Sequence, residues 1–207
     1  MNTKISATKS PKSNDNRLIL SDYNDFAWAK GFLTKTEIDF VKNAAKNNIL
    51  SLFLPRTSAN VFIQLLKNKG NTSCEKEEVR IAGNEMLSTL AHYKIKSVTL
   101  SSYLKVNRTK EFVEGMALGN YQFLKYFKTK KDKANSLKEI KIENNSISRQ
   151  ELKDLQAILD ATCIARDLVN EPQSYLSATQ LGKEVISLGK KHGFSVCLLY
   201  TSPSPRD

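Results

Sequence analysis

Few residues of this chain have the types and spacing that metal or nucleophilic chemistry requires. A catalytic metal ion needs carboxylate, histidine or lysine ligands that converge on it and leave one position open. The only histidines are His92 and His192, which stand far apart in the sequence and outside any HExxH spacing. We expect His92 to lie half-buried or in the last turn of a helix, where a positive charge favours the helix dipole. The sequence therefore predicts no metal ligands and no catalytic residue in this chain.

Cysteine chemistry has equally little support. Cys163 lies on the apolar side of a predicted helix, and no histidine stands near it in the pattern to act as its base. We expect this thiol to be buried and inert. The odd number and wide spacing of the three cysteines fit neither a disulfide framework nor a zinc knuckle, and they favour a reducing compartment.

Two predicted helices separated by a proline occupy the C-terminal part of the chain. Ser148 and Glu151 have the spacing of a capping box, which begins a helix. Pro172 ends that helix, because it lacks an N–H and pushes its predecessor out of the helical region. Ser177 begins the second helix, and Gly193 is free to take the left-handed conformation that ends it. The apolar stripe of the first helix is formed by Leu152, Leu155, Leu159 and Cys163, widened by Ile158 and Ile164.

Before this helix pair, apolar segments alternate with segments of helical period. Strands joined by helices pair in parallel through crossover connections. The expected fold class is therefore α/β, with a mainly parallel open sheet and helices on both of its faces. The predicted strands are 17–20, 49–54, 59–65, 95–100 and 140–142, and the predicted helices are 34–48, 75–94 and 109–126.

The composition fits a folded protein with a basic surface. The apolar fraction is 40%, and no apolar run reaches the length that a membrane-spanning helix needs. Residues 1–16 are rich in Ser, Thr, Asn and Lys and have no apolar core of a secretory signal, so we expect a disordered arm. The net charge of +11 attracts polyanions without specifying one.

A lysine-rich stretch beside aromatic residues raises nucleic acid as an alternative partner. Aromatic and basic side chains together are typical of single-stranded nucleic-acid binding. The aromatics also follow a helical spacing, which a packed helix end produces, and a solvated lysine loop needs no ligand. We therefore favour the packed helix end. The aromatics are Tyr121, Phe123, Tyr126 and Phe127, and the lysines are Lys125, Lys128, Lys130, Lys131, Lys133, Lys138 and Lys141.

Two further patches carry a family signal. Residues 161–177 read ATCIARDLVNEPQSYLS, and residues 114–126 read EGMALGNYQFLKY. The first resembles the junction between the N-terminal and catalytic domains of the leucyl aminopeptidase (cytosol aminopeptidase) family, peptidase family M17. The second resembles the EGxxLxxYxFxxY helix of the same family, and the two stand in the right order. The resemblance covers roughly residues 18–196, and it departs at Ala178, where relatives often carry the proline of a helix start.

The resemblance implies a domain plan. Residues 17–145 would form an N-terminal α/β domain of macrodomain-like fold, 146–172 a linker helix with its proline stop, and 173–196 the start of a truncated catalytic domain. The parent would be a cytoplasmic, hexameric enzyme that removes N-terminal residues from peptides with two divalent metal ions, Mn or Zn. The family's NTDAEGR motif is absent between residues 1 and 207. The chain alone should therefore be inactive.

The resemblance also suggests a role for the junction residues. Arg166 and Asp167 are adjacent on a helix and point in different directions, so they do not form a catalytic pair with each other. We assign Arg166, Asp167, Asn170, Glu171 and Pro172 to docking between the two domains.

The last eleven residues, 197–207, break the pattern. Their sequence, CLLYTSPSPRD, resembles the translation of a sequencing-library adaptor. A strand over 194–196 should lead into another helix and strand instead of a Ser/Pro tail. We therefore expect 197–207 to be artefactual and exclude it from the fold.

A second hypothesis is a stand-alone macrodomain-like module that binds a nucleotide or nucleic acid. Such a module has no need of a long helix, a proline stop and a further helix beyond it. A two-domain enzyme does, so the aminopeptidase fragment is the preferred hypothesis.

Overall fold

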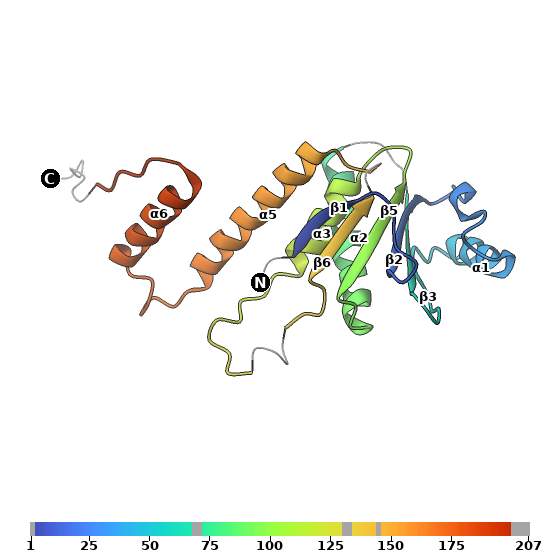
Figure 1. Cartoon of the computed structure of the whole chain (residues 1–207), viewed down its shortest axis with the longest axis horizontal. Helices are drawn as coiled ribbons and strands as arrows, with labels where there is room; N and C mark the ends of the chain where they lie inside the picture. Colours follow the sequence, from blue (N-terminus) through green and yellow to red (C-terminus); the bar gives the residue numbers. More distant parts are fainter. Residues whose placement is uncertain (1–2, 68–71, 130–133, 144–145, 200–207) are drawn as a thin grey trace. The chain divides into compact units, whose positions relative to one another are not determined.

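The computed structural model describes residues 3–67, 72–129, 134–143 and 146–199. The chain divides into two compact units, residues 1–163 and 164–207, and each is described by itself. The first unit holds a six-stranded sheet with its helices (Figure 1). The strands are β1 (Lys4–Thr8), β2 (Arg17–Asp22), β3 (Ser51–Leu54), β4 (Val61–Leu66), β5 (Ser97–Tyr103) and β6 (Glu139–Glu143). The helices given by the described residues are η1 (Ala27–Ala29), α1 (Lys35–Lys46), α2 (Ser73–His92), α3 (Thr109–Gly119), α5 (Arg149–Asn170) and α6 (Ala178–His192).

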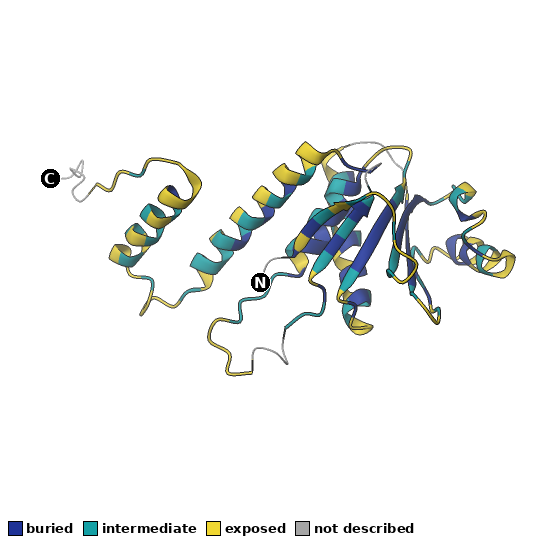
Figure 2. Cartoon of the chain, viewed as in Figure 1, coloured by how far each residue is buried: buried dark blue, intermediate teal, exposed yellow. Residues whose placement is uncertain are grey.

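The sheet is parallel except at one edge, which confirms the predicted fold class. Its strand order is β1-β6-β5-β2-β4-β3, and only the β3–β4 pair is antiparallel. Strand β4 shows why helices cover both faces, because all six of its residues are buried. Phe62 and Leu66 join the apolar cluster under α2 and α3, whereas Ile63 and Leu65 join the cluster under α1. Figure 2 shows the central strands as the most buried part of the chain.

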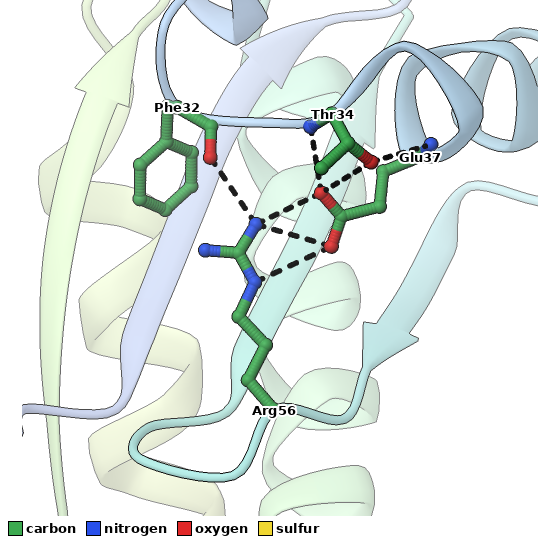
Figure 3. A network of polar contacts seen from close by, with 4 residues as sticks. All are labelled: Phe32, Thr34, Glu37 and Arg56. Atoms are coloured by element: carbon green, nitrogen blue, oxygen red, sulfur yellow. Dashed lines mark hydrogen bonds and ion pairs between the residues drawn. The ribbon is translucent and has the colours of Figure 1, made fainter.

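A polar network fixes the start of α1 to the β3–β4 turn (Figure 3). Thr34 and Glu37 form the capping box of α1, with Thr34 N donating to Glu37 Oε2 over 2.8 Å. The same carboxylate accepts hydrogen bonds from two nitrogens of Arg56. Nε donates to Oε1 over 3.3 Å, and Nη2 donates to Oε2 over 3.0 Å. Arg56 also donates to the Phe32 carbonyl and lies 5.1 Å from the centre of its ring. One carboxylate therefore caps the helix and ties it to the sheet.

Helices α2 and α3 pack unusually closely, because glycines stand where their backbones meet. A Cβ at Gly83 would lie 2.2 Å from the Phe112 carbonyl oxygen, and one at Gly115 would lie 2.0 Å from that of Arg80. The guanidinium of Arg80 reaches across to Glu114, with 2.9 Å between Nε and Oε2. The Glu-Gly pair of the 114–126 patch thus has a packing role in this unit.

The disorder expected for residues 1–16 is wrong for 4–8, which form the edge strand β1 in parallel register with β6. The Ile5 side chain is buried, and its N–H donates to Gln156 Oε1 of α5 over 2.9 Å. Only one large apolar residue stands in this strand, so the sequence carried no visible strand pattern. The strand is held by a partner far along the chain.

The helix predicted over 109–126 ends at Gly119. Asn120 is buried there, and its amide nitrogen donates to Thr3 Oγ1 and to the Leu137 carbonyl, each over 2.8 Å. Residues 121–126 are not helical, and Tyr126 is 54% exposed, so the expected packed helix end is wrong. Lys130, Lys131 and Lys133 lie outside the described residues.

Two expectations concern the end of the chain. The strand expected over 194–196 is wrong, because these residues form no strand. Of the segment expected to be artefactual, 200–207 lies outside the described residues, and Leu199 before it is 83% exposed. No helix in the described ranges is long and apolar enough to cross a membrane.

Candidate functional site

The predicted docking residues lie together at the end of α5 and in the turn after it, within the second unit. Arg166 and Asp167 are half-buried in the last turns of the helix, and Asn170 is its exposed last residue. The Asn170 amide nitrogen donates to the Arg166 carbonyl over 2.8 Å. Glu171 is half-buried and Pro172 exposed. The structure therefore gathers all five residues on one short segment.

Pro172 organises the turn that leads into α6. Its carbonyl accepts the N–H groups of Tyr175 and Leu176, each over 2.9 Å. Ser177 then caps α6 by accepting the Gln180 N–H over 3.3 Å, as its spacing predicted. The helix ends at Gly193, whose φ of 77° is the left-handed conformation. Both ends of α6 are thus set by local sequence.

The apolar residues of α6 are only partly buried in this chain. Gly189 is the buried residue of the helix, and Leu181 is 41% exposed. Val169, in the last turn of α5, is 84% exposed. A segment of this composition presents apolar surface of the kind that a partner surface covers.

No group of three or more His, Cys, Asp or Glu side chains within the described residues is placed to hold a metal ion. His92 is exposed in the last turn of α2, with its ring centre 4.9 Å from that of Tyr93. His192 is exposed in the last turn of α6. Cys163 is buried at 4% exposure, as expected of a structural thiol. The residues described here do not fit a two-metal centre.

Sequence reasoning missed a polar pocket at the carboxyl edge of the sheet. It has a volume of about 420 Å³ and opens where β2, β4 and β5 end. Its lining comes from three separate loops, so no single stretch of sequence shows it. The only local signal is that charged residues follow these strands. The lining residues are Asp22, Tyr23, Asn24, Asp25, Lys67 and Lys105.

Hydrogen bonds fix the shape of this pocket. The Asp22 carboxylate, 8% exposed as a residue, accepts the Lys105 N–H at Oδ2 over 2.9 Å. This bond joins the loop after β5 to the end of β2. Asp25 accepts the Ala27 N–H at Oδ1 over 3.0 Å, and the Tyr23 hydroxyl donates to the Ala45 carbonyl over 2.6 Å. The carboxylates are therefore held by backbone groups.

Comparison with known proteins places the chain beside the cytosol aminopeptidases. No protein-family model matches it. It is 34% identical over 137 residues to a probable cytosol aminopeptidase of Clostridium perfringens. This match covers 60% of this chain and 27% of that protein. A probable cytosol aminopeptidase of Alkaliphilus metalliredigens is 38% identical over 92 residues, 42% of this chain and 18% of that protein. The chain thus spans about a quarter or less of the length of these relatives.

Solved structures show the same likeness in fold. The tomato leucine aminopeptidase mutant K354E superposes with a TM-score of 0.69 at 12% identity, covering 92% of this chain and 43% of that one. The bottromycin maturation enzyme BotP in complex with Mn gives a TM-score of 0.59 at 19% identity. This superposition covers 87% of this chain and 37% of the BotP chain. The family resemblance predicted from 114–126 and 161–177 is confirmed: about half of the chain is similar in sequence to cytosol aminopeptidases, and its fold is similar to that of a leucine aminopeptidase, consistent with the N-terminal domain of such enzymes.

Proposed function

We propose that this chain is the N-terminal, non-catalytic part of a metal-dependent leucyl aminopeptidase that removes N-terminal residues from peptides. The observation that carries the proposal is the share of the relatives that is matched. The Clostridium perfringens protein is similar over 137 residues, yet this is 27% of its length. The remaining length of that protein is ample for a catalytic domain.

The junction residues fit a docking role in such a parent. Arg166, Asp167 and Glu171 offer charges of both signs on one short segment, and Pro172 sets the direction in which the chain leaves α5. The exposed apolar residues of α6 would then pack within the catalytic domain. In this arrangement the N-terminal domain is 17–145 together with strand β1 at 4–8, the linker is 146–172, and the catalytic domain starts at 173–196.

The metal chemistry of the parent would belong to that catalytic domain. The described residues offer no cluster of three metal-ligating side chains. A relative in fold, BotP, was solved in complex with Mn, and the family resemblance implies two divalent ions, Mn or Zn, in the parent. The metal ions would polarise the peptide carbonyl and supply an activated water. The residues of this chain would contribute orientation and assembly only.

The cellular setting follows from the relatives. They are named cytosol aminopeptidases, so we place the parent in the cytoplasm with peptides as its substrates. A homohexamer is the assembly that the family resemblance implies.

The proposal is tested by joining residues 1–196 to the catalytic reading frame that follows them in the source genome. The purified protein should hydrolyse leucyl amides when Mn²⁺ or Zn²⁺ is added and lose that activity to a chelator. Absence of a downstream frame with metal-ligating motifs, or a joined protein that folds and binds metal without turnover, would contradict it.

A further inference from the structure

The pocket at the carboxyl edge of the sheet lies where the connections after neighbouring strands lead to helices on opposite faces. From β2 the chain runs to η1 and α1, which pack on one face of the sheet. From β4 and β5 it runs to α2 and α3, which pack on the other face. Loops that leave neighbouring strands toward opposite faces open a crevice between them, and ligands of open α/β sheets bind in such crevices. Strand β2 lies between β4 and β5, so connections leave toward opposite faces on both of its sides.

Charges of both signs meet in this crevice. Asp22 and Asp25 come from the end of β2 and its loop, Lys67 directly follows β4, and Lys105 stands in the loop after β5. Within the described part of the chain none of these four side chains forms an ion pair. The pocket is therefore lined by two carboxylates and two ammonium groups that form no ion pairs with each other.

The arrangement is partly preorganised. Asp22 is more than nine-tenths buried and commits one carboxylate oxygen to the Lys105 N–H. Asp25 likewise uses one oxygen for the Ala27 N–H. The Lys67 ammonium lies 5.7 Å from the centre of the Tyr23 ring, which favours a position over the pocket wall. Each carboxylate thus keeps hydrogen-bonding capacity for a ligand.

We propose that this pocket binds a small zwitterion, a free α-amino acid or a dipeptide. Its ammonium group would lie against Asp25 and Asp22, and its carboxylate against Lys67 and Lys105. A simple anion such as phosphate would face two carboxylates, and a simple cation would face two ammonium groups. A ligand that carries both charges satisfies all four side chains. The volume of about 420 Å³ suits a small ligand of this kind.

Binding to the purified 207-residue chain tests the proposal. Leucine and glycylglycine are titrated by calorimetry, beside leucine amide, which lacks the carboxylate, and 4-methylpentanoate, which lacks the ammonium group. Inorganic phosphate serves as the simple anion. Leucine and glycylglycine should bind, and each of the three other probes should bind at least about tenfold more weakly, because one pair of charge-assisted hydrogen bonds is lost.

Three variants identify the site. Asp25→Asn keeps the oxygen that accepts the Ala27 N–H, and Lys105→Met keeps the backbone N–H that Asp22 accepts, so both should fold. Each should weaken leucine binding about tenfold. Lys42→Met, at an exposed position of α1, is the matched control and should leave the affinity unchanged.

Three results would overturn the proposal. One is no binding of leucine or glycylglycine at about 10 mM, a concentration well above a millimolar dissociation constant. Another is equal affinity for leucine and leucine amide. The third is phosphate binding that depends on Lys105 while leucine does not bind, which would make the pocket an anion site. None of these measurements uses peptide hydrolysis, so the outcome is independent of the aminopeptidase proposal.

Discussion

A single carboxylate, that of Glu37, joins two kinds of contact at the residue scale. It completes the capping box of α1 and forms a forked ion pair with Arg56 (Figure 3). The two side chains are 23% and 30% exposed, so water screens the pair less than it screens a surface pair. Removing the charge should therefore weaken the attachment of α1 to the β3–β4 turn.

Glu37→Gln should lower the free energy of unfolding by about 1–2 kcal/mol, because charge-assisted hydrogen bonds to Arg56 and to the cap are weakened. Urea denaturation followed by circular dichroism measures the change. Glu77→Gln is the matched control, since Glu77 pairs with Arg80 at 3.2 Å while 61% exposed. Its effect should stay below about 0.5 kcal/mol. Equal effects of the two variants would show that the Glu37 network contributes no more than a surface pair.

Acid should destabilise the first unit through two carboxylates. Burial raises the pKa of Glu37, but hydrogen bonds from Thr34 and Arg56 outweigh it and hold that pKa below its ordinary 4.5. Burial likewise raises the pKa of Asp15, but hydrogen bonds from the Lys12 backbone and the Lys141 side chain outweigh it and hold that pKa below its ordinary 3.8. In both cases the unfolded chain binds more protons than the folded one at mildly acidic pH.

The stabilisation from these carboxylates is present above the ordinary pKa values and is lost as pH falls through the lower folded ones. The free energy of unfolding should therefore decline below about pH 4.5, and the decline should be shallower in Glu37→Gln. Urea midpoints measured across this range test the sign. A midpoint that rises on acidification, or a slope unchanged by the variant, would contradict this account.

At the scale of elements, the contact between α2 and α3 depends on two glycines. Gly115→Ala would place a Cβ 2.0 Å from the Arg80 carbonyl oxygen, a backbone atom that cannot rotate away. The helices must then move apart, at a cost of about 1–3 kcal/mol. Ser88→Ala, at an exposed position of α2, is the control and should stay within about 0.5 kcal/mol. Thermal unfolding compares the two, and an alanine tolerated at 115 would mean that the helices do not pack this closely.

Sequence patterns found the elements whose signals are local. Ser148 and Glu151 bond reciprocally at the start of α5, with 3.1 Å from Glu151 N to Ser148 Oγ, because the capping box acts over three residues. The strand at 4–8 and the end of α3 were missed for the opposite reason. Ile5 is held by Gln156, and Asn120 by Thr3 and Leu137, and all of these partners are remote in sequence. The pocket was missed because its four charges come from three loops.

At the scale of the whole molecule, the chain combines a complete sheet with a segment that has little burial of its own. In α6 the buried residue is Gly189, whereas β2 and β4 are buried over almost their whole length. Stability in such a chain should differ between the units, because local opening depends on the apolar surface that an element buries.

Hydrogen exchange measured by mass spectrometry should show this difference. Amides of residues 178–190 should exchange at rates far above those of β2 and β4, and joining the downstream catalytic domain should protect them. Protection of 178–190 equal to that of the sheet in a monomer of this chain would contradict the proposed role of the catalytic domain in covering α6.

The most direct test of the central claim is hydrolysis by residues 1–207 alone. A two-metal site lowers the pKa of a bound water and polarises the carbonyl, and orientation by a domain without the ligands cannot replace that effect. The purified chain, shown to be free of host peptidases, should give no turnover of leucyl amides with added Mn²⁺ or Zn²⁺. Metal-dependent hydrolysis that a chelator abolishes would contradict the claim that the chemistry lies outside this chain.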